Sequence, residues 1–160
     1  MPSPLLLATH ITIAIALTIT VGVQSAELAR IRSGARAEPT TPALRAALWS
    51  TPVLALLTFI TGVAVVADGG RRGPWLAAGV LSTLIIGLAS VWLQFRLRRV
   101  ALGSTGLVGA VEWGVPAMTL AAAFLMADRP QNVIVVVGSV LAAAGVTALA
   151  YWTSSRTATP

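Results

Sequence analysis

Glu112 is the residue whose position most directly suggests chemistry, because it is an acid well inside a long apolar segment, residues 106–127 of this 160-residue chain. An ionised carboxylate is costly inside a bilayer, so such side chains tend to face the interior of a helix bundle and to be functional. Pro116 follows four residues later and lacks the N–H that would otherwise donate to the carbonyl oxygen of Glu112. One helix turn would therefore present a titratable side chain and an unpaired carbonyl oxygen, which suits a proton, a cation or a donor group of a ligand.

Helical spacing gives residues 106–127 two special faces. Glu112 shares one face with Gly109 and Pro116, and these three residues form the candidate ligand or proton site. The nearly opposite face carries small residues that would let another helix approach closely, namely Gly106, Ala110 and Gly114. We expect a helix with two such faces to be central in its bundle.

The partners of Glu112 can be anticipated from depth in the predicted spans. An alternative is that Glu112 lies near the headgroups, or is neutral and bonded to a Ser or Thr. No basic residue lies at the depth of Glu112, so we expect a proton-sharing hydrogen bond to a hydroxyl or a ligand rather than a salt bridge. The polar side chains expected at its level are Thr18, Thr51, Ser90 and Thr147.

His10 is the second titratable side chain inside a predicted span. It could act as a haem ligand, a proton relay or a quinone contact. The alternative is a neutral histidine bonded to a hydroxyl near the interface. His10 and Glu112 should lie on the order of 10 Å apart along the membrane normal, by a rise of about 1.5 Å per residue, so we do not expect them to be partners.

Composition places the chain among membrane proteins, because 56% of its residues are hydrophobic and only 10% are charged. The absence of Cys excludes disulfides and thiolate metal sites, and a single His excludes a multi-histidine metal site within one chain. The net charge of +6 comes from arginines in short loops. No soluble domain is long enough to offer a nucleic-acid-binding face, so nucleic acid is not expected as a partner.

Five apolar runs of about 20 residues are each long enough to cross a hydrocarbon core of about 30 Å. We predict an all-α membrane protein, a single integral domain over residues 1–160, with helices near 5–23, 48–67, 75–93, 106–127 and 133–152. Thr41 and Pro42 predict a helix start, as do Pro74 and Asn132, and Asp68 predicts a stop.

Arginines predict the orientation of the bundle. Eight lie on the side that we assign to the cytoplasm, namely Arg30, Arg32, Arg36, Arg45, Arg96, Arg98, Arg99 and Arg156. Three lie on the other side, namely Arg71, Arg72 and Arg129. This asymmetry puts the N-terminus outside and the C-terminus in the cytoplasm. The bias towards Ala, Gly, Val and Arg is typical of a GC-rich bacterial genome, so the predicted location is a bacterial plasma membrane.

An internal repeat is suggested by residues that recur 60 positions apart. Asp68 matches Asp128, and the same offset relates Trp92 to Trp152 and Arg96 to Arg156. A parallel repeat of helical hairpins would relate helices two and three to helices four and five. Chance similarity among apolar, interface-anchored helices is the alternative.

The first three predicted helices resemble small bacterial membrane families of the CopD and HemJ type. The resemblance uses His10, the Arg-rich first loop, Thr61-Gly62 at the end of helix two, and Pro74-Trp75 at the start of helix three. It implies handling of haem or copper by membrane histidines. This chain differs in having His10 alone, with no cluster of Met and His inside the membrane.

Three functions follow as hypotheses. The first is a non-enzymatic accessory or ligand-binding subunit, associated with the bilayer and with other membrane subunits or with itself through its small-residue faces. The second is a proton- or cation-coupled carrier that uses Glu112. The third is a haem-binding or redox membrane protein that uses His10. No phosphate loop, dinucleotide fingerprint or Ser-His-Asp pattern occurs, which favours a protein that is not an enzyme.

Overall fold

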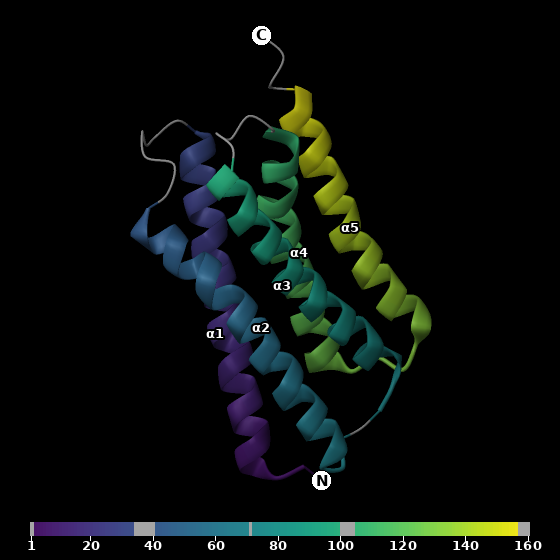
Figure 1. The fold of residues 1–160 in the computed structure, drawn as a ribbon. Coiled ribbons are helices and arrows are strands. Elements are labelled where there is room, and N and C mark those ends of the chain that lie inside the picture. Colours follow the sequence, from purple (N-terminus) through teal and green to yellow (C-terminus); the bar gives the residue numbers. More distant parts are fainter. Residues whose placement is uncertain (1, 34–40, 71, 100–104, 157–160) are drawn as a thin grey trace.

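The computed structural model describes residues 2–33, 41–70, 72–99 and 105–156, and within them every regular element is an α-helix. The orientation argument also uses Arg36 and Arg71, which lie outside the described residues. Figure 1 shows a bundle of long helices. They are α1 (Pro4–Arg32), α2 (Pro42–Ala67), α3 (Pro74–Arg99), α4 (Thr105–Asp128) and α5 (Val133–Arg156). The start of α1 and the end of α5 lie at opposite ends of the bundle (Figure 1).

Each helix is long and apolar enough to cross a membrane, which indicates a multi-pass membrane protein. The predicted number of spans is therefore confirmed at this level. The predicted helices are too short. The clearest case is α1, which was expected to end near residue 23 but ends at Arg32. Hydropathy falls after Val23, yet neither Pro nor Gly follows before Arg32, so the backbone hydrogen bonds continue.

Helix ends follow the local signals in the sequence. The Thr41 hydroxyl accepts from the backbone N–H of Leu44 (3.0 Å), and Pro42 occupies the first turn, where its missing N–H costs nothing. Asn132 caps α5 in a similar way, since its Oδ1 accepts from the N–H of Ile134 (2.9 Å). Asp68 ends α2 as predicted. Capping stabilises helix ends because their first N–H groups have no partner within the helix.

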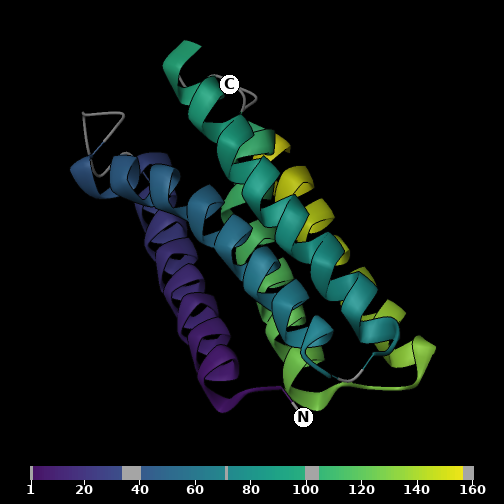
Figure 2. The ribbon, with the colours of Figure 1, turned by 60° about the horizontal axis from the view of Figure 1, so that its bottom comes forward.

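Helices α1 to α4 form a closed ring in which each helix contacts the next and α4 returns to α1. Helix α5 packs on the outside of this ring, mainly against α4 (Figure 2). The apolar span of α4 is 44% buried, compared with 39% for α3 and 17% for α1, α2 and α5, and α4 also contacts α1, α3 and α5. The expected central position of this helix is therefore confirmed.

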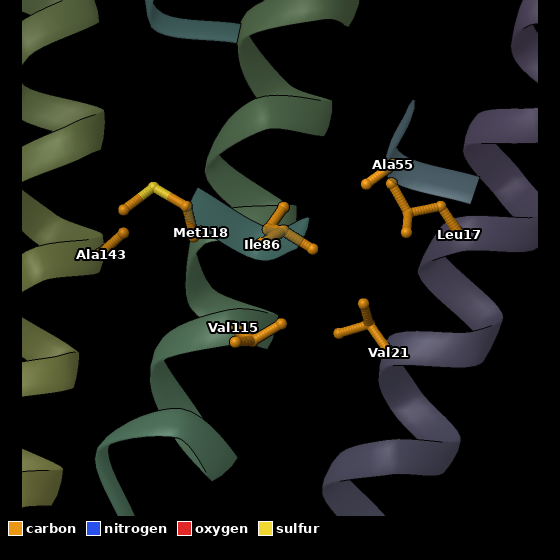
Figure 3. Close-up of a cluster of buried hydrophobic side chains, with 7 residues drawn as sticks. All are labelled: Leu17, Val21, Ala55, Ile86, Val115, Met118 and Ala143. Carbon is orange, nitrogen blue, oxygen red and sulfur yellow. The ribbon is translucent and has the colours of Figure 1, made fainter. Parts of the chain in front are cut away.

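The largest apolar cluster crosses the middle of the bundle and takes residues from all five helices (Figure 3). Its buried members are Leu17, Val21, Ala55, Ile86, Val115, Met118 and Ala143. A second cluster lies towards the end of the bundle where α1 ends, and consists of Leu28, Leu44, Leu48, Leu93 and Val108. We call this side the C-terminal end, because α5 also ends there, and the opposite side the N-terminal end.

Glycines allow the close approach of α4 to α5. A Cβ atom placed on Gly114 would lie 2.6 Å from Oγ1 of Thr147, and one on Gly109 would collide with Oγ of Ser154. A Cβ on Gly106 would collide with Oγ of Ser155. Small residues of this kind are a usual device of helix packing in membranes.

Gly109 and Gly138 form a matched pair for testing this packing. We expect Gly109→Ala to lower stability by about 1–3 kcal/mol, because the new methyl group overpacks the contact with α5. Gly138 has open space around its Cβ position, so Gly138→Ala should keep or raise stability through better helix propensity. The measurement is the free energy of unfolding of each purified variant in mixed micelles. Equal losses in both variants would contradict the packing argument.

Candidate functional site

Glu112 points into the bundle, as predicted, and is only 4% exposed. It lies on the α4 face that also carries Val108 and Val115, which belong to the two apolar clusters on either side of it. Its Oε2 atom lies 3.3 Å from Nη1 of Arg32. The expectation of a hydroxyl partner instead of a salt bridge is therefore wrong.

Arg32 reaches Glu112 from the last turn of α1, beyond the predicted end of that helix. The same Nη1 donates to Oγ of Ser154 on α5 (2.8 Å). Gly109 leaves room for both groups, because a Cβ there would lie 2.8 Å from Arg32 Nη1. The ion pair thus joins α1, α4 and α5 at one point, with the Arg32 side chain 37% exposed and that of Glu112 5% exposed.

A second polar group centres on Gln24, which is 1% exposed on α1. Its amide lies 3.2 Å from the hydroxyls of both Thr51 on α2 and Ser90 on α3. The hydroxyl of Thr51 also donates to the nearer carbonyl oxygen of Ala47 (2.8 Å). Oε1 of Gln24 accepts from the hydroxyl of Ser90 and shares that of Thr51 with Ala47, whereas Nε2 has no hydrogen-bond partner among the described residues.

Gln24, Thr51, Ser90 and Glu112 occupy one level of the bundle, which we call the polar layer. Gln24 lies between Val21 and Leu28 of the two apolar clusters. Val111, next to Glu112, packs against both clusters, which puts Glu112 at the same level. The prediction that Thr51 and Ser90 lie near the depth of Glu112 agrees with this arrangement, although their described bonds go to Gln24.

Glu27 extends the polar contacts one turn further along α1. Its carboxylate accepts from the hydroxyl of Thr41 (2.7 Å) and from Nη1 of Arg30 (2.7 Å). Since Thr41 also caps α2, this contact ties the end of α1 to the start of α2. Sequence reasoning missed Gln24, Glu27 and Arg32. The signal for them was the lack of any helix breaker after Val23, which leaves three polar residues on a continuing helix.

The remaining predicted neighbours of Glu112 lie elsewhere. Thr18 is exposed on α1 and donates to the carbonyl oxygen of Ala14 (2.9 Å). Thr147 contacts α4 at Gly114 and donates to the carbonyl oxygen of Ala143 (2.8 Å). Pro116 lies inside α4, so the carbonyl oxygen of Glu112 has no N–H to accept from at the usual position.

His10 lies far along α1 from Arg32 and bonds to Thr61 on α2, with Nδ1 and Oγ1 2.9 Å apart. The Thr61 hydroxyl directs its proton to the carbonyl oxygen of Leu57 (2.8 Å), so Nδ1 of His10 is the donor in this contact. Nε2 of a neutral ring is then left as an acceptor and potential ligand atom. Gly62 lies against the ring, because a Cβ there would be 3.3 Å from Cε1.

A groove of about 450 Å³ opens beside His10, between α1 and α4 at the N-terminal end. We call it the α1/α4 groove. Helix α1 lines one wall with Leu7, His10, Ala14 and Thr18, and α4 lines the other with Ala123 and Met126. A smaller cavity of about 120 Å³ adjoins it and shares Gly62, Val66, Leu76 and Met126 with it. The lining is largely apolar, which is typical of sites for apolar ligands.

Polar groups gather at the mouth of the α1/α4 groove. Trp75 and Arg129 both line it, and the guanidinium carbon of Arg129 lies 6.0 Å from the centre of the Trp75 ring. Arg129 has a positive φ of 49°, which is unusual for a residue other than glycine and turns the chain sharply after α4. Among the described residues no three His, Cys, Asp or Glu side chains form a metal-binding group.

Comparison with protein-family models, with curated proteins and with solved structures finds no match for this chain. The functional argument therefore rests on two features of the described structure. These are the Arg32–Glu112 pair with the polar layer, and the α1/α4 groove.

A double-mutant cycle tests how much the ion pair between Arg32 and Glu112 contributes to the free energy of unfolding. We expect Arg32→Gln to destabilise the protein more than Glu112→Gln, because it leaves a buried carboxylate without its counter-charge, whereas Arg32 keeps Ser154 and partial exposure. The two losses should couple by about 1–3 kcal/mol. The measurement is equilibrium unfolding of the four proteins in mixed micelles. Strictly additive losses would show that the two charges do not interact.

Proposed function

We propose that this chain is a non-enzymatic membrane subunit that binds a membrane-soluble, chain-like molecule in the α1/α4 groove. The observation that carries the proposal is the groove itself, which is about 450 Å³ in volume and is lined mainly by α1 and α4 at the N-terminal end of the bundle. Its lining offers His10 and Arg129 but no nucleophile paired with a base. Such a lining suits recognition rather than reaction.

The dimensions of the groove support an occupant that comes from the bilayer. Its lining on α1 runs from Leu7 to Thr18, which is roughly 16 Å at a rise of about 1.5 Å per residue. Half of a hydrocarbon core of about 30 Å is a similar length. The groove thus has the depth of one leaflet, and a hydrocarbon chain that lies parallel to the helices would fill it.

The ion pair supports a structural role for Glu112 more than a carrier role. A bound cation would have to share the carboxylate with the guanidinium of Arg32, which lies 3.3 Å from Oε2. The cation and the guanidinium would then lie close together and repel each other. A cation-coupled carrier therefore fits this geometry poorly. A proton-coupled carrier remains the second candidate, because Oε2 of Glu112 forms an ion pair with Arg32 but has no hydrogen-bond partner among the described residues.

Filling the groove tests the proposal. Ala14 lines the groove on α1, and we expect Ala14→Phe to reduce retention of the bound molecule by at least fivefold. Ala8 is exposed on the same helix and does not line the groove, so Ala8→Phe is the matched control. The measurement is mass spectrometry of the organic extract from protein purified in mild detergent.

The extract also identifies the occupant. A lipid or other chain-like molecule that is lost only in Ala14→Phe supports the proposal. Equal retention in both variants, or no bound molecule in the parent protein, contradicts it. A haem Soret band that disappears in His10→Ala would replace the proposed ligand by haem, as the third hypothesis requires.

We further propose a bacterial plasma membrane with the N-terminus outside, on the strength of the arginine asymmetry. The parallel repeat belongs to the same proposal, and two features support it. Pro52 and Pro116 each lie inside the first helix of their hairpin. Trp49 and Trp113, three residues before them, are both exposed, at 56% and 54%.

Orientation is tested by reporter fusions at the C-terminus. We expect a C-terminal alkaline phosphatase fusion to be inactive and a C-terminal green fluorescent protein fusion to be bright, because the first folds outside and the second folds in the cytoplasm. The control is the same pair of reporters fused within the loop between α4 and α5, which should give the opposite result. A highly active C-terminal phosphatase fusion would reverse the orientation.

A further inference from the structure

The mouth of the α1/α4 groove carries one buried donor without an acceptor, on Trp75, and the positive charge of Arg129. Trp75 is 8% exposed, and its Nε1 has no hydrogen-bond partner among the described residues. Arg129 donates from Nε to the carbonyl oxygen of Met126 (3.4 Å), and no ion pair engages its guanidinium within the described part of the chain. A buried N–H without a partner is costly, so this edge of the groove favours an acceptor supplied from outside the chain.

Charge at the mouth has the sign that would attract an anion. Arg129 lines the groove, whereas the two acids at this end do not. Asp68 accepts from the backbone N–H of Ser3 (2.7 Å), and Asp128 is exposed at the end of α4. The left-handed backbone at Arg129 turns the chain there, with the guanidinium near the Trp75 ring. Arginine is well suited to phosphate because its planar group presents several N–H donors at once.

We propose that the occupant of the groove is a lipid with an anionic headgroup, and that Arg129 and Trp75 bind that headgroup while the hydrocarbon chain lies along α1. The inference rests on the proposed function, since it assigns the ligand class of the same groove. The groove runs from the charged mouth at Arg129 to Thr18, about the depth of one leaflet. A headgroup at one end and a chain along the rest therefore match both its polarity and its length.

Quenching of Trp75 fluorescence tests the inference. The other four tryptophans are exposed and can be replaced by Phe, namely Trp49, Trp92, Trp113 and Trp152. The single-tryptophan protein is placed in nanodiscs of unlabelled phosphatidylcholine that contain increasing amounts of a lipid with brominated chains. This lipid is either phosphatidylglycerol or phosphatidylcholine with the same chains. We expect half-maximal quenching at an at least threefold lower mole fraction of brominated phosphatidylglycerol.

Two charge variants decide which residue gives the preference. Arg129→Gln should remove the preference for the anionic lipid while quenching by both lipids persists. Arg72→Gln removes the same charge at the same end of the bundle, but Arg72 is exposed and does not line the groove, so the preference should remain.

The outcomes separate this inference from the proposed function. Equal quenching by both lipids in the parent protein would overturn the headgroup assignment and leave a groove that binds chains alone. A preference that survives Arg129→Gln, or that Arg72→Gln removes equally, would also overturn it. No quenching by either lipid would overturn the occupancy of the groove by lipid, and the proposed function with it.

Discussion

A carboxylate brought into the middle of a membrane bundle has to be given a partner, and Glu112 finds one in Arg32. The cost of an unpaired charge in such surroundings is several kcal/mol, so the partner constrains everything around it. Helix α1 has to continue as far as Arg32, α4 has to present Glu112 to the interior, and α5 has to bring Ser154 to the same guanidinium. The three helices thus meet at one contact, which is buried on the Glu112 side.

Gly109 shows how closely the packing depends on this contact. It lies one turn before Glu112, where any side chain would collide with Ser154 and crowd Arg32. The short distance between α4 and α5 and the ion pair therefore need the same residue to be small. Gly114 repeats the arrangement one turn later against Thr147. The small residues of α4 thus allow close packing of the helices, and Glu112 adds a buried charge that needs a partner.

The sequence predicted the fold well, because spans, caps and the central position of α4 depend on local composition and spacing. The buried position of Glu112 followed from the cost of exposing an acid to lipid. Its partner could not be predicted in this way. Arg32 lies outside the apolar run, and a long arginine side chain can reach back from the end of its helix to a group at greater depth. The α1/α4 groove was also beyond prediction, because it depends on how the helices that line it pack against one another and not on the sequence of any one of them.

The two ends of the bundle have different physical characters, and this difference directs the functional interpretation. At the C-terminal end, three polar side chains of α1 link it to the other four helices, namely Gln24, Glu27 and Arg32. Because these contacts reach all four other helices, they hold the end of α1 in place relative to the rest of the bundle. At the N-terminal end, α1 meets α4 across a groove lined by Trp75 and Arg129. Nε1 of Trp75 has no acceptor among the described residues, and Arg129 makes no ion pair among them. Because the first end holds the helices together, the second can stay open without loss of the fold.

An open apolar groove in a bilayer does not remain empty, since a void inside the hydrocarbon forfeits the dispersion contacts that a chain would make. The contacts at the C-terminal end therefore explain how the fold tolerates a groove. Trp75 and Arg129 explain what kind of molecule the groove would select.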